Sequence, residues 1–171
     1  PGDILILVQS RSLLFAELIR ALGQHNIPTP GADRLAVTGH IAVLDLLALA
    51  DVLLTPADDL QLAALLRSPL FDISEDDLMA LAAGRSGTLW QALPASSLPQ
   101  AQEAAARLRR WRGELDFDRP FEFYAEILYR DGGLRRFHAR LGAEVDDVMA
   151  EFLDLALAHE QTQNPSLQGF V

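Results

Sequence analysis

The segment DILILVQSR, from Asp3 to Arg11, contains a continuous apolar run from Ile4 to Val8. Such a run is typical of a strand that is buried on both faces of a parallel sheet. A buried central strand needs neighbours on both sides to satisfy its backbone N–H and C=O groups. No other segment has this pattern, and the sequence begins at Pro1. We therefore interpret the chain as an internal segment of a longer protein.

The rest of the sequence has apolar residues at helical spacing. The stretch from His40 to Leu54 is almost entirely apolar, which predicts the central helix of a bundle, with Thr38 as its N-cap. Further helices are predicted over residues 12–24, 56–67, from 74 onward, 88–93, 100–113, 119–130, 134–141 and 143–161. We expect a mainly α fold, with a helical subdomain at 37–171 attached to one strand–helix unit of an α/β domain at 1–36. The stretch from Pro94 to Pro99 is the candidate internal linker.

The amino-acid composition excludes several classes of function. The chain has 171 residues, a formal net charge of −10, no cysteine and no lysine. Without lysine it cannot carry the phosphate-loop motif G-x-x-x-x-G-K-[ST] or perform Schiff-base catalysis. Without cysteine it forms no disulfides, which fits a cytoplasmic location. No apolar run approaches the roughly 20 residues that cross a bilayer, so we expect no membrane partner.

The charge is unevenly distributed along the chain. Residues 100–142 contain 9 arginines and 7 acidic residues, whereas residues 143–171 contain 6 acidic residues and no basic one. Four arginines cluster around Trp111, at Arg107, Arg109, Arg110 and Arg112. One interpretation is a solvated helix face paired with neighbouring acids. The other is a set of phosphate contacts with duplex DNA, with Trp111 either buried or stacking. A second group is Arg130, Arg135, Arg136 and Arg140.

Histidines and acidic pairs give weaker signals. The four histidines lack the spacing of a metal site, so no metal is expected. The acidic pairs at 58–59, 76–77 and 146–147 each lie near a predicted helix start, where carboxylates stabilise the helix dipole. Helix capping is therefore favoured over a catalytic pair of carboxylates.

Three stretches carry a resemblance to a known family. They are DILILVQSR with the following LLFAELIRAL and NIPTPGADRL, then the segment from Thr38 to Leu47, and LAALLRSPLFDISEDDL from Leu62 to Leu78. Together they resemble the superfamily-one DNA helicases of the UvrD, Rep and RecB type, and within them the AddA-type helicase–nuclease subunits of double-strand-break repair. The first stretch resembles helicase motif IV.

This resemblance implies a place within a larger enzyme. Residues 1–36 would be the first strand and helix of the second RecA-like motor domain, and residues 37–171 a helical accessory insert. The parent enzyme would bind ATP and Mg, act on DNA and pair with an AddB-like subunit, whereas this segment alone would bind no cofactor and be inactive. The implied nucleotide-contact residues are Gln9 and Arg11. The implied DNA contacts are Arg34, Thr38, His40, Arg67, Ser68, Arg107, Arg109, Arg110 and Arg112.

Two positions depart from the family pattern. Gln9 stands where the family usually has an arginine that reaches the γ-phosphate, and Asp72 stands where a glycine is common. The alternative function is a free-standing α-helical protein-interaction module whose acidic surface meets a basic partner. A standalone hydrolase is disfavoured because no nucleophile and base have suitable spacing.

Overall fold

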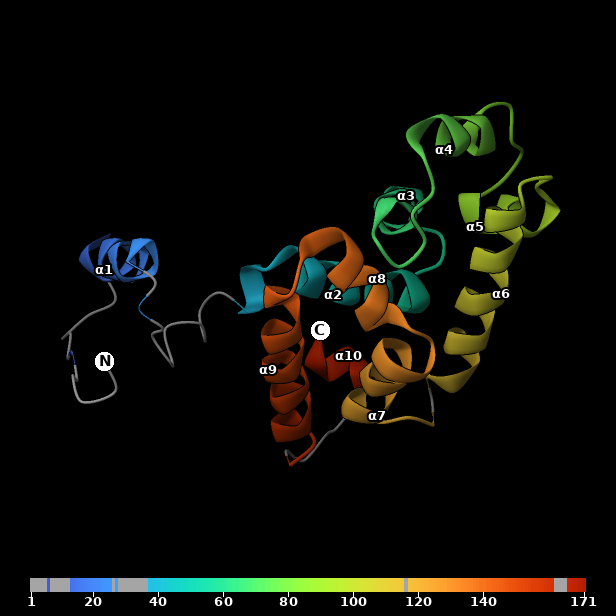
Figure 1. Ribbon diagram of the computed structural model, residues 1–171. Helices are drawn as coiled ribbons and strands as arrows, with labels where there is room; N and C mark the ends of the chain where they lie inside the picture. The colour runs from blue at the N-terminus through green and yellow to red at the C-terminus, as the bar shows by residue number, and fades with distance from the viewer. Residues whose placement is uncertain (1–5, 7–12, 26, 28–36, 116, 162–165) are drawn as a thin grey trace. The chain divides into compact units, whose positions relative to one another are not determined.

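The computed structural model describes residues 6, 13–25, 27, 37–115, 117–161 and 166–171 (Figure 1). The chain divides into two compact units, Pro1–Val37 and Thr38–Val171. Within the described residues every regular element is helical, so the predicted mainly α class is confirmed. The strand predicted from Ile4 to Val8 lies outside the described residues except for Ile6, which belongs to no regular element.

The first unit contains helix α1, Leu13–Gln24, which confirms the helix predicted over residues 12–24. Its end is marked by backbone bonds in which the N–H groups of His25 and Ile27 donate to the carbonyl of Leu22, at 3.1 and 3.0 Å. An exposed ion pair joins Arg20 to Glu17 across one helical turn. Such a pair contributes only about 0.3–0.5 kcal/mol.

The second unit is a bundle of helices joined by short connections. Its α-helices are α2 (Ile41–Leu54), α3 (Asp59–Arg67), α4 (Glu75–Ala82), α5 (Leu89–Ala92), α6 (Pro99–Glu114), α7 (Pro120–Ala125), α8 (Gly133–Leu141), α9 (Glu144–His159) and α10 (Leu167–Phe170). Two short 3-10 turns are η2 (Val37–Gly39) and η3 (Leu93–Ala95), and η4 (Glu126–Arg130) is a single π-helical turn.

Helix α2 is the central helix, as its apolar sequence predicts. Helices α3, α6, α9 and α10 all pack against it, and Leu46 and Leu49 are fully buried. The predicted N-cap is wrong. His40 caps the helix, with extended backbone and Nδ1 accepting from the Ala42 N–H at 3.2 Å, whereas Thr38 is exposed within η2. A histidine acceptor satisfies the same orphan N–H that a threonine oxygen would.

The predicted linker from Pro94 to Pro99 does not separate two units. Leu93 is buried in η3, and η3 packs against α6, which begins at Pro99. Proline at the first helical position loses no hydrogen bond, because that N–H has no partner within the helix. The proline-rich stretch is therefore a turn that starts α6.

The carboxy-terminal helices close the bundle. Helix α9 buries Met149, Phe152 and Leu153, whereas Leu157 is 44% exposed because it lies about 80° around the helix from Met149. The following short helix α10 is capped by Ser166, and Phe170 places its ring 5.6 Å from that of Phe152. The end of the described chain thus contributes to the core.

Candidate nucleic-acid interface

Three predicted contact residues lie outside the described residues. These are Gln9 and Arg11, assigned to the nucleotide, and Arg34, assigned to DNA. The other predicted DNA contacts lie in the second unit, and four of them are in helix α6.

The arginines of α6 point to two different sides of the helix. Successive residues are rotated by about 100° in an α-helix, so Arg107 and Arg110 lie within about 60° of one another, as do Arg109 and Arg112. The centres of these two pairs are about 160° apart. The four side chains therefore cannot form one continuous phosphate-binding surface.

Arg107 is built into the interior beside the loop that follows α3. Its guanidinium lies 4.9 Å from the ring centre of Phe71 and 4.7 Å from that of Trp111, and its Nη1 donates to the carbonyl of Leu70 at 2.8 Å. Burial, and after it the nearby Arg136, lower its pKa to about 10. Arg107 is thus a packing residue rather than an exposed phosphate ligand.

Trp111 and Arg110 both bind the carboxylate of Asp131. The indole Nε1 of the fully buried Trp111 donates to Asp131 Oδ2 at 2.7 Å, and Arg110 forms an ion pair with the same oxygen. Arg110 also lies 4.0 Å from Glu114. Of the two alternatives for Trp111, the buried one is confirmed, and Arg110 is paired with acids.

Arg109 and Arg112 face the other way and are exposed. Among the described residues Arg109 has no ion-pair partner, and the contact found for Arg112 is with Trp90, whose ring centre lies 5.8 Å from its guanidinium. Such exposed cation–π contacts leave the guanidinium N–H groups in water. These two arginines are therefore free to contact phosphates.

The loop after α3 contains the other predicted contacts. Ser68 is buried and its Oγ accepts from the Leu70 N–H at 3.3 Å, so it organises the turn instead of facing a ligand. Arg67 is half-buried and lies 3.4 Å from Glu75. Asp72 has φ +53°, the left-handed conformation that favours glycine. The family resemblance implies a glycine at this same position.

Three arginines of the second group lie on α8, and of these Arg136 lies nearest to Arg107. Arg140 donates to Asp72 at 2.8 Å, and Arg136 lies 3.8 Å from Glu103 of α6. Arg130, in η4, is paired with Glu126. Arg135 is exposed and has no ion-pair partner in the described part of the chain. Helix α8 itself, GLRRFHARL, contains no acidic residue, a signal from which sequence reasoning could have ranked it above α6.

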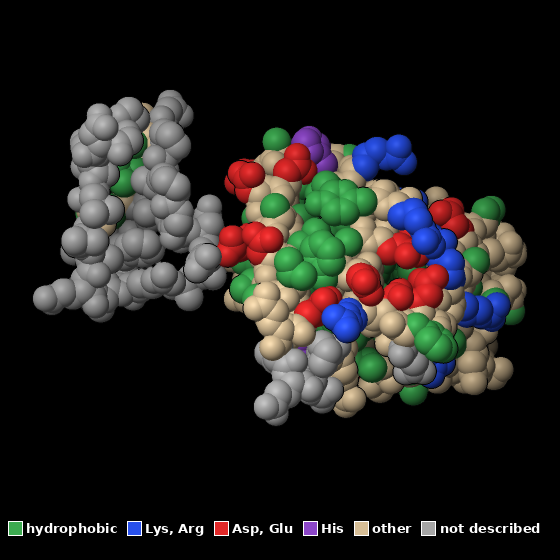
Figure 2. Space-filling model, turned by 90° about the horizontal axis from the view of Figure 1, so that it is seen from below, with side chains coloured by type: hydrophobic (Ala, Val, Ile, Leu, Met, Phe, Trp, Pro, Cys, Tyr) green, Lys and Arg blue, Asp and Glu red, His purple; other side chains and the backbone are tan. Residues whose placement is uncertain are grey.

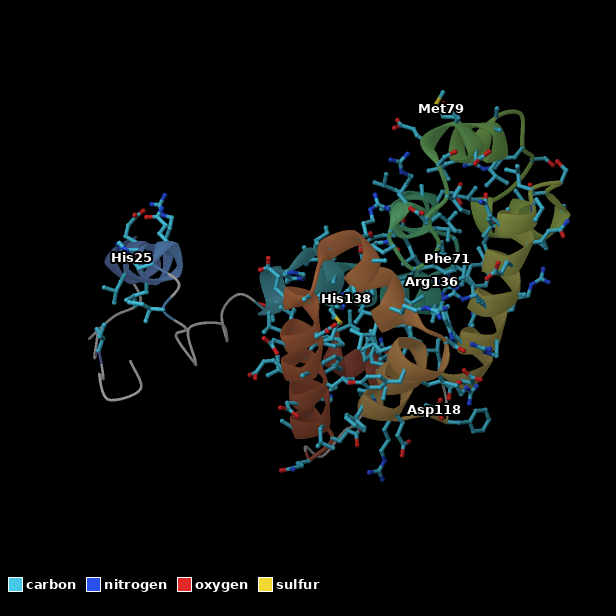
Figure 3. The ribbon with its side chains drawn as sticks, in the orientation of Figure 1. His25, Phe71, Met79, Asp118, Arg136 and His138 are labelled. Carbon is cyan, nitrogen blue, oxygen red and sulfur yellow. The ribbon has the colours of Figure 1, made fainter. Side chains whose placement is uncertain are left out.

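Side chains of opposite charge lie close together on the surface of the second unit. Figure 2 shows one face of the second unit, on which hydrophobic side chains are bordered by both basic and acidic ones. In Figure 3 Phe71 and Arg136 lie between α6 and α8, with His138 on the far side of α8. On this face basic and acidic side chains therefore lie next to one another.

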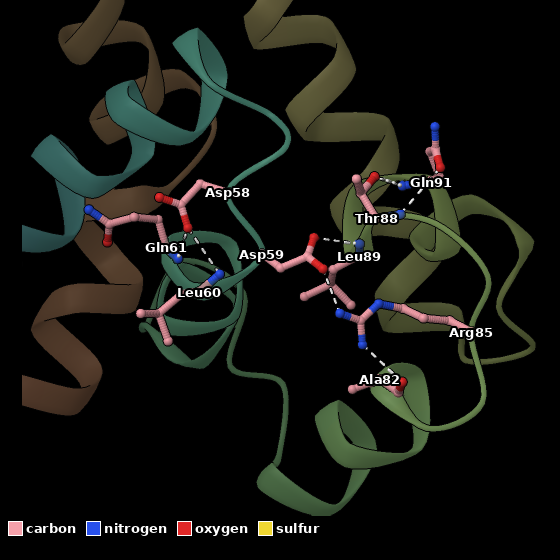
Figure 4. A network of polar contacts seen from close by, with 9 residues as sticks. All are labelled: Asp58, Asp59, Leu60, Gln61, Ala82, Arg85, Thr88, Leu89 and Gln91. Carbon is pink, nitrogen blue, oxygen red and sulfur yellow. Dashed lines mark hydrogen bonds and ion pairs between the residues drawn. The ribbon is translucent and has the colours of Figure 1, made fainter.

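The carboxylates of the first acidic pair, Asp58 and Asp59, form hydrogen bonds and an ion pair within the fold (Figure 4). Asp58 caps α3 by accepting from two backbone N–H groups, at 3.0 and 3.1 Å, as predicted. Asp59 instead accepts from the Leu89 N–H at 2.7 Å and pairs with Arg85 at 2.5 Å. The Leu89 N–H and then Arg85 hold the pKa of Asp59 below its usual value. These carboxylates join α3 to α5 and form no converging catalytic pair.

The described residues show neither a metal-binding cluster nor a membrane-spanning helix. Over the described ranges, no three or more histidine and acidic side chains are grouped so that they could hold a metal ion. In the same part of the chain, every helix is too short or too polar to cross a bilayer. Neither observation assigns a function.

The sequence matches no protein-family model and no curated protein. The resemblance to AddA-type helicases therefore stays a prediction that rests on the stretches quoted above. What the structure adds is the surroundings of each arginine.

Proposed function

We propose that this chain is the helical accessory insert, with the first strand–helix unit of the second RecA-like motor domain, of an AddA-like ATP-dependent DNA helicase–nuclease. The parent enzyme acts in double-strand-break repair and recombination in the cytoplasm, uses ATP and Mg, and pairs with an AddB-like subunit. The insert holds duplex DNA through arginine–phosphate contacts. This segment contributes no catalytic residue and has no ATPase, helicase or nuclease activity by itself.

The observation that carries the proposal is the division of the chain. A separate compact helical unit begins at Thr38. The helicase resemblance places the end of the motor segment at residue 36, within two residues of that point. An insertion that folds as its own compact unit agrees with an accessory subdomain that interrupts a motor domain.

The exposed arginine pair on α6 supports a contact with DNA phosphates. Arg109 and Arg112 are exposed on the side of α6 away from Asp131, and Trp90 lies next to Arg112. Arginine forms charge-assisted hydrogen bonds with phosphate oxygens in two-point geometry. Each phosphate contact releases counterions, so binding should weaken as salt increases.

The test is fluorescence anisotropy of a labelled duplex with a single-stranded tail, titrated with the chain at two salt concentrations. We expect the double variant Arg109→Glu and Arg112→Glu to bind at least tenfold more weakly than the unsubstituted chain. Its log–log salt dependence should be shallower by about 2, because about 0.9 counterions are released per phosphate contact. Arg107 and Arg110 are excluded from the test because their substitution would disturb the core.

The matched control is the double variant Arg20→Glu and Arg119→Glu, which changes two exposed arginines and the net charge by the same amount. An equal loss of affinity in both double variants would show that the chain responds to net charge alone. If the unsubstituted chain does not bind the duplex at low salt, the proposed contact with duplex DNA is wrong.

The acidic carboxy-terminal region favours a second candidate, a protein-interaction module. Residues 143–171 contain 6 acidic residues and no basic one. On α9, Glu144, Asp147 and Asp154 are exposed. This surface suits a basic protein partner. Binding that is abolished by Asp147→Arg and Asp154→Arg, and untouched by changes at Arg109 and Arg112, would favour this candidate.

A further inference from the structure

The turn between α7 and α8 has an unusual backbone. In η4 the helix widens to i→i+5 bonding, and the Asp131 N–H donates to the Glu126 carbonyl at 3.0 Å. Single π-helical turns of this kind occur frequently at functional sites. The side chains on the surface of this turn are therefore of interest as a candidate binding site.

Two glycines fix the turn in place. Gly132 has φ +73°, a left-handed conformation that favours glycine. Gly133 lies against its neighbours so closely that a Cβ would be 2.7 Å from the carbonyl oxygen of Ile127 and 3.2 Å from Leu70 Cδ2. The backbone at the end of η4 is therefore closely packed against Leu70 of the loop after α3.

A groove of about 550 Å³ lies between this turn and α8. Its lining includes Tyr129, Arg130, Gly132, Arg135, His138 and Asp146. Tyr129 is 60% exposed, whereas Tyr124, five residues earlier, is fully buried. An aromatic ring on a rigid turn, exposed beside a groove, can stack on a planar ligand without a large loss of conformational entropy.

Most charges that line the groove are already balanced. Arg130 is paired with Glu126, and Asp131 accepts from Trp111. His138 Nδ1 lies 3.2 Å from both carboxylate oxygens of Asp146.

Arg135 is the cation of this groove for which no ion-pair partner occurs in the described ranges. A Cβ placed on Gly132 would lie 3.7 Å from its Nη2, so the guanidinium reaches over the glycine turn. The groove therefore combines one exposed aromatic ring with one uncompensated positive charge.

We propose that this groove binds one nucleotide of a single-stranded nucleic acid, with Tyr129 stacking on the base and Arg135 contacting a phosphate. The inference rests on the proposed DNA-binding function and adds the form of nucleic acid that this site takes. Every base has a π-face, so an aromatic platform with a nearby cation binds single strands with little sequence preference.

The opposite side of α8 extends the same arrangement. There a second groove, of about 430 Å³, is lined by Phe71, Asp72, Arg136 and Arg140 among others, and both arginines have carboxylate partners, Asp72 for Arg140 and Glu103 for Arg136. A strand that crosses the acid-free helix α8 would leave the Tyr129 groove and meet another aromatic ring with two arginines. Tyrosine and arginine also dominate protein–protein hot spots. The uncompensated charge of Arg135, beside an exposed ring that can stack on a base, favours a nucleic acid over a protein partner.

The experiment uses a fluorescein-labelled oligothymidylate of twelve nucleotides and anisotropy at low salt. We expect Tyr129→Ala to weaken binding about fivefold or more, and Tyr129→Phe to retain it, because stacking needs the ring and not the hydroxyl. Arg135→Gln should weaken binding and make its salt dependence shallower by about 0.7, the value for single strands.

The matched control is Phe117→Ala, which removes another highly exposed aromatic ring that does not line the groove. It should leave the affinity unchanged. Both aromatic variants remove exposed side chains, and their circular dichroism and unfolding midpoints should match the unsubstituted chain. A second readout is the fluorescence of 2-aminopurine placed in the oligonucleotide, which should be quenched by stacking on Tyr129 and not in Tyr129→Ala.

Failure of the groove and failure of the duplex contact are distinguishable. If oligothymidylate does not bind, or if Tyr129→Ala and Phe117→Ala bind it with equal affinity, the groove proposal is overturned. The contact with duplex DNA is then judged from the anisotropy of the duplex alone. If Tyr129→Ala weakens single-strand binding while Arg109→Glu with Arg112→Glu leaves duplex binding unchanged, the groove stands and the duplex contact fails.

Discussion

The two sides of helix α6 carry the same residue type and have different roles. On one side Arg107 packs between two aromatic rings and Arg110 pairs with Asp131. On the other side Arg109 and Arg112 are exposed. The arginine side chains are equivalent in the sequence, so the difference comes from the elements that face each side of the helix.

What the comparison teaches is that a cluster of charges in sequence is not a cluster in space. On the α8 side of α6, Arg107 donates to the Leu70 carbonyl, and Arg110 and the buried Trp111 share the carboxylate of Asp131. The stability of that side should depend strongly on its polar contacts, whereas the stability of the outward side should not.

The largest expected effect is at Asp131. Replacing Asp131 with alanine leaves the indole N–H of the buried Trp111 without an acceptor and Arg110 without its ion-pair partner. We expect the free energy of unfolding to fall by about 2–3 kcal/mol. Urea denaturation followed by tryptophan fluorescence measures this change.

The control for this substitution is Asp154→Ala, which removes an exposed carboxylate on α9 and should cost no more than about 0.5 kcal/mol. If the two alanine variants unfold at the same urea concentration, the polar contacts on the α8 side of α6 are not what holds that side together.

A second test contrasts two partly buried carboxylates. Asp131 has donors, whereas Asp45 in α2 has a buried Oδ2 with no hydrogen-bond partner in the described ranges. Burial raises the pKa of Asp45 to about 6, and Arg140 partly offsets this effect. The folded chain therefore holds a proton on Asp45 that the unfolded chain releases between about pH 4 and pH 6, so stability falls as pH rises through that range.

Asp45→Asn removes this charge. We expect its free energy of unfolding to exceed that of the unsubstituted chain by about 1 kcal/mol at pH 7, after allowance for the solvent that screens a half-buried group. The difference should disappear below about pH 3, where Asp45 is protonated in both states. Urea denaturation at the two pH values measures it, and a difference that grows as the pH falls would contradict the assignment.

Much of the helical framework was predictable from local sequence. The caps Asp58, Ser74 and Thr88 lie at or beside predicted helix starts, and the structure shows each accepting from backbone N–H groups of the first turn. Local signals suffice there because a cap is satisfied by residues within one turn.

The surroundings of the arginines could not be predicted in this way. Asp131, which decides the role of Arg110, is 21 residues away in sequence and comes from the turn before α8. Residues 119–130 carry an ordinary helical pattern, and nothing in that pattern distinguishes the π-helical turn that exposes Tyr129. These features depend on how α8 packs, as does the exclusion of a Cβ at Gly133.

A smaller effect is expected at Asp72, where a surface arginine can be compared with the buried Arg107. Asp72 is exposed, has φ +53° and pairs with Arg140 at 2.8 Å. Asp72→Gly removes left-handed strain of about 1 kcal/mol and loses an exposed ion pair of about 0.5 kcal/mol or less. We therefore expect a net gain of about 0.5 kcal/mol in urea denaturation.

Asp72→Ala provides the counterpart, because it loses the ion pair and keeps the left-handed backbone. It should be less stable than Asp72→Gly by about 1 kcal/mol. Equal stability of the two variants would mean that the loop relaxes to another backbone conformation.

The smallest expected effect completes the comparison between the two sides of α6. Arg109→Ala and Arg112→Ala should each change the free energy of unfolding by no more than about 0.5 kcal/mol, since neither side chain satisfies a buried group. Arg107→Ala should cost more than either, because the Leu70 carbonyl and two aromatic rings lose their partner. If Arg109 and Arg107 prove equally costly, the outward side of α6 is also engaged within the fold, and its arginines are not free for phosphates. If they differ as expected, the affinity lost in Arg109→Glu with Arg112→Glu can be attributed to the contact with DNA and not to unfolding.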